Sequence, residues 1–125
     1  MFGIQTREKI MEQYDALVKL KSIIEEAESI AEKYLDLIKL ENGEKNISNL
    51  LETKAKKLIT QFSDSYSKLD NLSSKIEETT ANFINDSFKP ITSYTTFFNK
   101  TLSTLKYIKK LVIDEINSKT IWSSS

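Results

Sequence analysis

Apolar residues recur with the spacing of an α-helix along the first third of the chain, from residue 5 to about residue 41. One series of positions seven residues apart is formed by Ile10, Leu17, Ile24, Ala31 and Ile38. Neighbouring apolar positions widen this stripe to about three positions in seven, which is the width of a helix that packs against two neighbours. The stripe ends at Asn42-Gly43. Because glycine readily adopts the left-handed conformation that closes a helix, we predict that the first helix ends there.

A second helical pattern runs from about residue 47 to residue 86, with Asn46 or Ser48 as the expected N-cap. Its inward positions are Leu51, Leu58, Ser65, Leu72 and Thr79, interleaved with Ala55, Phe62, Leu69, Ile76 and Phe83. Two of these positions carry hydroxyl side chains, and serine and threonine have a lower helix propensity than alanine. We therefore predict one continuous helix over 47–86 that is the least stable part of the molecule.

The only proline, Pro90, precedes a third pattern that extends to about residue 118. A proline in a helix interior costs about 3 kcal/mol, whereas in the first turn it costs almost nothing. We therefore predict a corner at 86–90 and a helix that begins at Pro90, with a kinked continuous helix as the alternative. The expected core positions of this helix are Phe98, Leu105 and Val112, and the expected water-facing positions are Lys100, Lys106 and Lys110.

Together these patterns predict an all-α fold, an elongated three-helix up-down-up bundle or antiparallel coiled coil with helices at about 5–41, 47–86 and 90–118. Two glycines and one proline are too few turn residues for an all-β fold. We expect a single domain over 1–118 and a short polar tail over 119–125. Residues 1–43 carry nine acidic and six basic residues, whereas residues 90–125 carry two and five. The opposite net charges favour docking of the first helix beside the third.

The composition excludes several chemistries. The chain has no cysteine and no histidine, which excludes disulfides, ordinary zinc sites and catalysis by Ser-His-Asp or Cys-His groups. We expect no metal, no cofactor and no enzymatic activity, and we expect Glu28 and Glu32 to lie on a solvated face. The basic run Lys54, Lys56 and Lys57 is also expected on a solvated face. A net charge of zero and a single arginine argue against a nucleic-acid partner.

Two functions remain open. The first is a non-enzymatic structural or interaction protein, such as a subunit, adaptor, chaperone or inhibitor, that contacts a protein partner or forms a homo-oligomer. The apolar residues expected to remain for such contacts are Met11, Val18, Leu35, Ile59, Tyr66 and Ile113. The alternative is an amphipathic protein that binds a membrane, lipid or storage-granule surface through residues 91–116. Its lipid-facing residues would be Tyr94, Phe97, Phe98, Leu102, Lys106 and Lys110. The expected location is cytoplasmic, with leaderless export left open.

Overall fold

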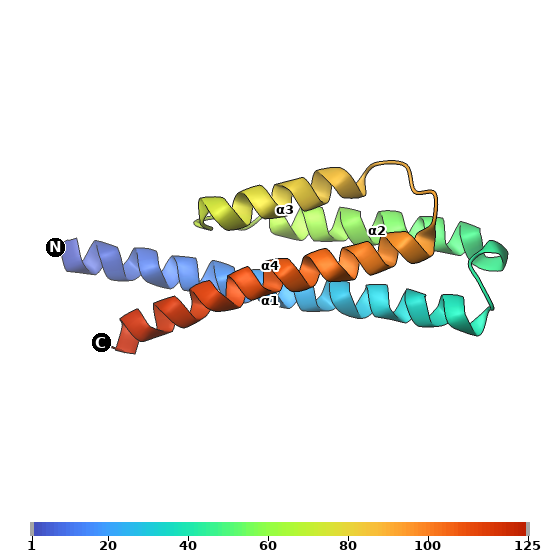
Figure 1. Cartoon of the computed structure of the whole chain (residues 1–125). Helices are drawn as coiled ribbons and strands as arrows, with labels where there is room; N and C mark the ends of the chain where they lie inside the picture. Colours follow the sequence, from blue (N-terminus) through green and yellow to red (C-terminus); the bar gives the residue numbers. More distant parts are fainter. Residues whose placement is uncertain (1, 125) are drawn as a thin grey trace.

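The computed structural model describes the backbone of residues 2–124 and the side chains of residues 7–119. Within this range the chain is all-helical, which confirms the predicted fold class. Its elements are α1 (Phe2–Leu40), the 3₁₀ turn η1 (Lys45–Ile47), α2 (Ser48–Tyr66), α3 (Ser74–Ser87) and α4 (Tyr94–Ser124). Figure 1 shows an up-down-up-down arrangement in which α1 and α4 form a long antiparallel pair. The shorter α2 and α3 cover part of that pair, and both chain ends lie at the same end of the molecule.

The prediction of a three-helix bundle is wrong because the expected helix over 47–86 is divided into α2 and α3. The residues between them are rich in Ser, Asp and Asn, which bond to nearby backbone groups and favour turns. Asn71 adopts the left-handed conformation with φ of 67°. The hydroxyl oxygen of Ser73 then accepts a hydrogen bond from the Ile76 backbone N–H and caps α3. Leu69 and Leu72, although outside both helices, pack against the core and so preserve the apolar repeat in the sequence.

The prediction that Pro90 begins the last helix is also wrong. Pro90 is exposed in the linker, and α4 begins at Tyr94. The Ser93 hydroxyl oxygen accepts a hydrogen bond from the Thr96 backbone N–H at 3.3 Å, as an N-cap does. A proline only permits a first turn, whereas a capping oxygen satisfies the exposed N–H groups, and the helix therefore begins after Ser93. At its other end α4 continues to Ser124, so the predicted boundary at residue 118 does not interrupt the helix.

The end of α1 follows the prediction. Asn42 has a φ of 58° and Gly43 a φ of 128°. The Gly43 N–H donates to the Ile38 carbonyl at 2.9 Å, and the Asn42 N–H donates to the Lys39 carbonyl at 3.2 Å. These two bonds form a Schellman motif, which satisfies carbonyls at the helix end. Neither Asn46 nor Ser48 is the N-cap of α2, because η1 leads directly into the helix and places Ile47 at that position.

The core lies mainly between α1 and α4, which form the most extensive helix pair. Phe98, Leu105 and Val112 are fully buried, as predicted. The Phe98 ring stacks on Tyr34 of α1, with 5.9 Å between ring centroids. Lys100, Lys106 and Lys110 are exposed, which confirms the predicted polar face of α4. The first and last helices therefore lie side by side, as their charges favoured.

Candidate interaction surfaces

A partly buried ion pair joins α1 and α4. The Lys109 amine lies 2.7 Å from a carboxylate oxygen of Glu28, and the two side chains are 27% and 8% exposed. The expectation that Glu28 lies on a solvated face is therefore wrong, because α4 covers it. The hydrogen bond with Glu28 raises the pKa of Lys109, against the desolvation that lowers it, and the charges of Glu25 and Glu32 add to the rise. This cluster is structural, and no group of potential ligands that could hold a metal occurs among the described residues.

A second polar contact lies at the end of the bundle away from the two chain termini. The Glu44 carboxylate, from the turn after α1, accepts hydrogen bonds from the Tyr94 and Thr95 backbone N–H groups at 3.0 and 2.8 Å. It also accepts from the Thr95 hydroxyl at 2.7 Å. Desolvation acts to raise the pKa of Glu44, but the hydrogen bonds from Thr95, Tyr94 and Ser93 outweigh it and leave this pKa lowered. Glu44 is thus an N-terminal cap for α4 supplied by another part of the chain.

Three exposed apolar residues form one stripe on α1, which we call the α1 stripe. Met11, Tyr14 and Val18 are 66%, 39% and 42% exposed. Their spacing of three and four residues places them on one side of the helix. Two of them, Met11 and Val18, were among the contact residues expected from the sequence. The stripe lies on the side of α1 opposite its buried residues.

The other expected contact residues lie deeper. Ile59 is 1% exposed, so a partner cannot reach it in the folded bundle, and its assignment as a contact residue is corrected. Helix α2 buries its predicted apolar positions and Ile59 in addition, because it packs against α1, α3 and α4. Leu35 and Tyr66 are partly buried against the core, and the Tyr66 ring stacks on Phe62. Ile113 is also partly buried.

The residues expected to face lipid divide into three groups. Phe98 and Leu102 are buried, and Tyr94 and Phe97 pack against the core with part of their surface exposed. Of the six residues, only Lys106 and Lys110 are exposed in this arrangement. No helix in the described part of the chain combines the length and the apolar character needed to cross a bilayer.

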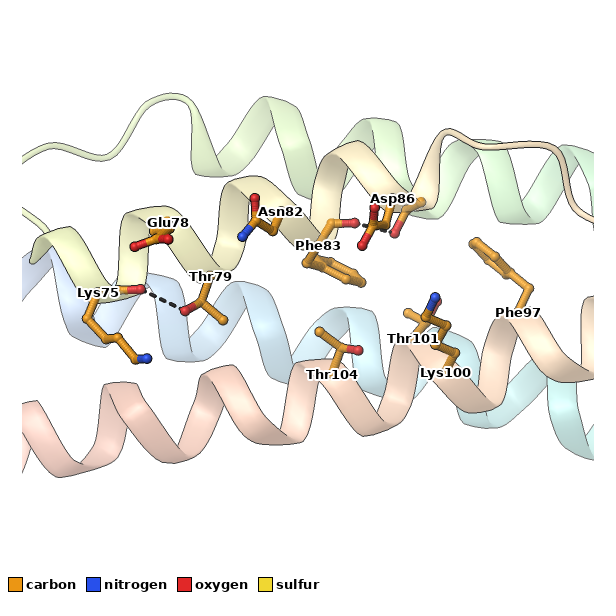
Figure 2. A pocket seen from close by; sticks show the side chains of 11 residues that line it. Lys75, Glu78, Thr79, Asn82, Phe83, Asp86, Phe97, Lys100, Thr101 and Thr104 are labelled. Atoms are coloured by element: carbon orange, nitrogen blue, oxygen red, sulfur yellow. Dashed lines mark hydrogen bonds between the residues drawn. The ribbon is translucent and has the colours of Figure 1, made fainter.

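A groove between α3 and α4 has a volume of about 350 Å³. Figure 2 shows Phe83 of α3 and Phe97 of α4 pointing into the space between the two helices, with polar side chains from both helices beside them. Thr79 donates its hydroxyl hydrogen to the Lys75 carbonyl at 2.8 Å, so this hydroxyl is occupied within α3. The rim carries charges of both signs, which gives the α3–α4 groove no preference for an anionic or cationic ligand. Its charged residues are Lys75, Glu78, Asp86 and Lys100.

A longer depression follows the seam between α1 and α2, and we call it the α1–α2 groove. It consists of three hollows of about 410, 240 and 210 Å³. Ile23 is shared by the first two hollows, and Ile30 and Leu58 are shared by the second and third, so the hollows adjoin. Sequence reasoning missed this groove. The available signals were the extra apolar positions of the first helix and the basic run that contains Lys54 and Lys57.

No protein-family model, no curated protein and no solved structure matches this chain. The functional argument therefore depends on the surfaces described above.

Proposed function

We propose that this is a non-enzymatic helical interaction protein that acts through protein–protein contacts and associates with itself. The observation that carries the proposal is the α1 stripe, in which the apolar residues Met11, Tyr14 and Val18 are exposed together on one side of the helix. Apolar residues gathered on one exposed helix face mark contact sites more than isolated ones do.

The residues around the α1 stripe are self-complementary. If two copies of α1 cross antiparallel about a twofold axis at residue 16, Tyr14 of each copy lies opposite Val18 of the other. The same axis places Arg7 opposite Glu25, and each pair occurs twice, as in an isologous interface. Met11 then faces the aliphatic stem of Lys21, whose amine forms an ion pair with Glu25 at 3.5 Å. Apolar contacts in the centre and opposite charges at the ends support this pairing.

The contact is small. Residues 7–25 span about 27 Å of helix, and one helix face buries less than the roughly 800 Å² per partner that is typical of stable complexes. We therefore expect a reversible dimer with a dissociation constant above ~1 μM.

Analytical ultracentrifugation over a range of concentrations tests this proposal. We expect the wild-type protein to shift from monomer to dimer, and the double variant Met11→Glu/Val18→Glu to remain monomeric. Tyr107→Glu is the matched control, because Tyr107 is an exposed apolar residue on α4. Arg7→Glu should weaken the dimer, and Arg7→Glu/Glu25→Arg should restore it. A wild-type protein that stays monomeric to ~1 mM, or an equal effect of the control, contradicts the proposal.

The alternative of a lipid surface requires a larger rearrangement. Since Phe98 and Leu102 are buried against the other helices, α4 would have to leave the bundle before these residues met lipid. Flotation with anionic and neutral vesicles separates the two functions. Flotation of the wild-type protein that Phe98→Ala abolishes, while the fold is retained, would favour the lipid function.

A further inference from the structure

We infer that the α1–α2 groove binds an acidic amphipathic helix of another protein. The groove follows the seam of two antiparallel helices, and its three adjoining hollows form a continuous track. Between Lys19 and Lys33 the track spans about 21 Å along α1, which corresponds to roughly four turns of helix. An amphipathic helix that lays its apolar side into such a track is a common mode of peptide recognition.

The floor of the groove has the spacing that a helix requires. Ile23 and Ile30 line the floor, where both are partly buried. They lie seven residues apart, about 10.5 Å along the helix axis. Leu58 reaches the floor from α2. A partner helix with apolar residues at positions i, i+4 and i+7 presents a stripe of matching length. The floor thus requires an apolar face of about two turns.

The rim of the groove determines the charge of the partner. Five lysines line it, Lys19 and Lys33 from α1 and Lys54, Lys57 and Lys68 from α2 and the turn that follows. Only Glu26 and Asp64 oppose them, so the rim has an excess of three positive charges. The ion pairs of the described residues engage other lysines, namely Lys21, Lys56, Lys89 and Lys109. Glutamate or aspartate on both flanks of the partner's apolar stripe complements this rim.

A protein helix fits the groove better than nucleic acid does. The rim contains lysine and no arginine, whereas bidentate recognition of phosphate favours arginine. The carboxylates of Glu26 and Asp64 would repel a phosphate backbone, and the apolar floor would remain unused. An acidic helix uses both the floor and the rim.

The inference rests on the proposed function in that both make the protein a binding partner of other proteins. The two sites, however, occupy different sides of α1. At 100° per residue, Ile23 in the groove is rotated by about 140° from Val18 in the α1 stripe. The variant Met11→Ser/Val18→Ser, which adds no charge beside Lys19 and Ser22 of the groove, should therefore weaken self-association and leave binding in the groove unchanged, so that each proposal can fail without the other.

The probe is a synthetic helical peptide of about 18 residues, fluorescein-labelled, with leucines on one face and glutamates on both flanks. Fluorescence anisotropy at moderate salt should give a dissociation constant of roughly 10–100 μM. A peptide of the same composition, reordered so that leucine and glutamate no longer separate by face, is the control ligand. It should bind at least tenfold more weakly.

Two sets of protein variants test the location. Lys33→Glu/Lys57→Glu should weaken binding of the probe about tenfold or more, because two attractions become repulsions. Lys106→Glu/Lys110→Glu removes two exposed lysines of α4 and should change binding by less than about twofold. Ile23→Ala/Ile30→Ala, checked for an unchanged circular dichroism spectrum, should also weaken binding. Failure of the probe to bind at ~1 mM, equal binding of the reordered peptide, or equal effects of the two lysine pairs overturns the inference. Competition by duplex DNA or anionic vesicles at lower concentration than unlabelled peptide would overturn it too.

Discussion

The long pair α1–α4 and the short hairpin α2–α3 differ in the length of their helices and in the side chains that they bury. The helices of the long pair have 39 and 31 residues, whereas those of the hairpin have 19 and 14. The interface of the long pair contains stacked aromatic rings, aliphatic side chains and the Glu28–Lys109 ion pair. The hairpin has aromatic contacts too, with Phe62 packed edge-on against Phe83 at 5.4 Å. Each region also buries one hydroxyl residue, Thr80 in the hairpin and Thr101 in α4.

The difference shows what limits a helix in this chain. An uninterrupted apolar repeat is buried along its length by a neighbour, and that burial sustains a long helix. Where hydroxyl and amide side chains enter the repeat, the burial is weaker and local backbone contacts compete with the helix. The hairpin should therefore open more readily than the long pair. The following substitutions test this contrast, beginning with the largest effect.

Truncation of one aromatic ring in each region should lower the free energy of unfolding by different amounts. Phe98→Ala should lower the free energy of unfolding by about 3–5 kcal/mol, because it leaves a cavity between α1 and α4. Phe83→Ala should lower it less, since the hairpin can detach while the long pair persists. Urea denaturation measures the free energies, and hydrogen exchange locates the opening. Uniformly accelerated exchange in Phe83→Ala would show that the bundle opens as one unit.

Removal of the buried ion pair should have an intermediate effect. Lys109→Ala leaves the Glu28 carboxylate buried without its partner, and we expect a loss of about 1–3 kcal/mol because Lys109 is partly solvated. The double variant Glu28→Leu/Lys109→Met should recover most of this loss, since an apolar pair needs no compensating charge. Lys110→Ala, at an exposed neighbouring position, should change stability by less than ~0.5 kcal/mol. Thermal and urea denaturation of the four proteins measure these differences. A double variant as unstable as Lys109→Ala would contradict the explanation.

The cap of α4 should have the smallest effect and should depend on pH. The pKa of Glu44 is lowered by folding from an ordinary value of 4.5, so the carboxylate stabilises the fold above that pH. This contribution is lost as the pH falls through the lower pKa of the folded protein. Glu44→Gln should therefore cost about 0.5–2 kcal/mol at neutral pH and almost nothing in strong acid. Urea denaturation at neutral and acidic pH provides the comparison. An unchanged difference in acid would mean that shape, not charge, makes the cap effective.

The sequence predicted what periodicity and local turn chemistry control. The end of α1 at Asn42-Gly43, the buried face of α4 and its exposed lysines all follow from the order of residues. The break between α2 and α3 was not predicted, because Leu69 and Leu72 maintain the apolar repeat through a linker that still packs against the core. The local cap of α4, Ser93, could have been recognised in the sequence, whereas its second cap, Glu44, lies about fifty residues away in the chain.

The candidate sites show the same division. Exposure of Met11 and Val18 could be predicted, since they lie outside a strict repeat. The burial of Ile59 could not be predicted, because the face that α2 buries depends on the number of helices. The α1–α2 groove depends on side chains from two helices whose separation only the tertiary structure fixes. Glu28 resembles the other acidic residues of α1 in sequence, and only the position of Lys109 distinguishes it.

The pairing of the first helix with the last also governs how the chain folds as it is synthesised. The Glu28–Lys109 contact joins residues 81 positions apart, so the largest interface must close a long loop. At roughly 5–20 residues per second, Lys109 leaves the ribosome about 4–16 s after Glu28. During that interval α2 can cover only part of the apolar face of α1. Chaperones should therefore bind most strongly to nascent chains that contain α1 and α2 but lack α4.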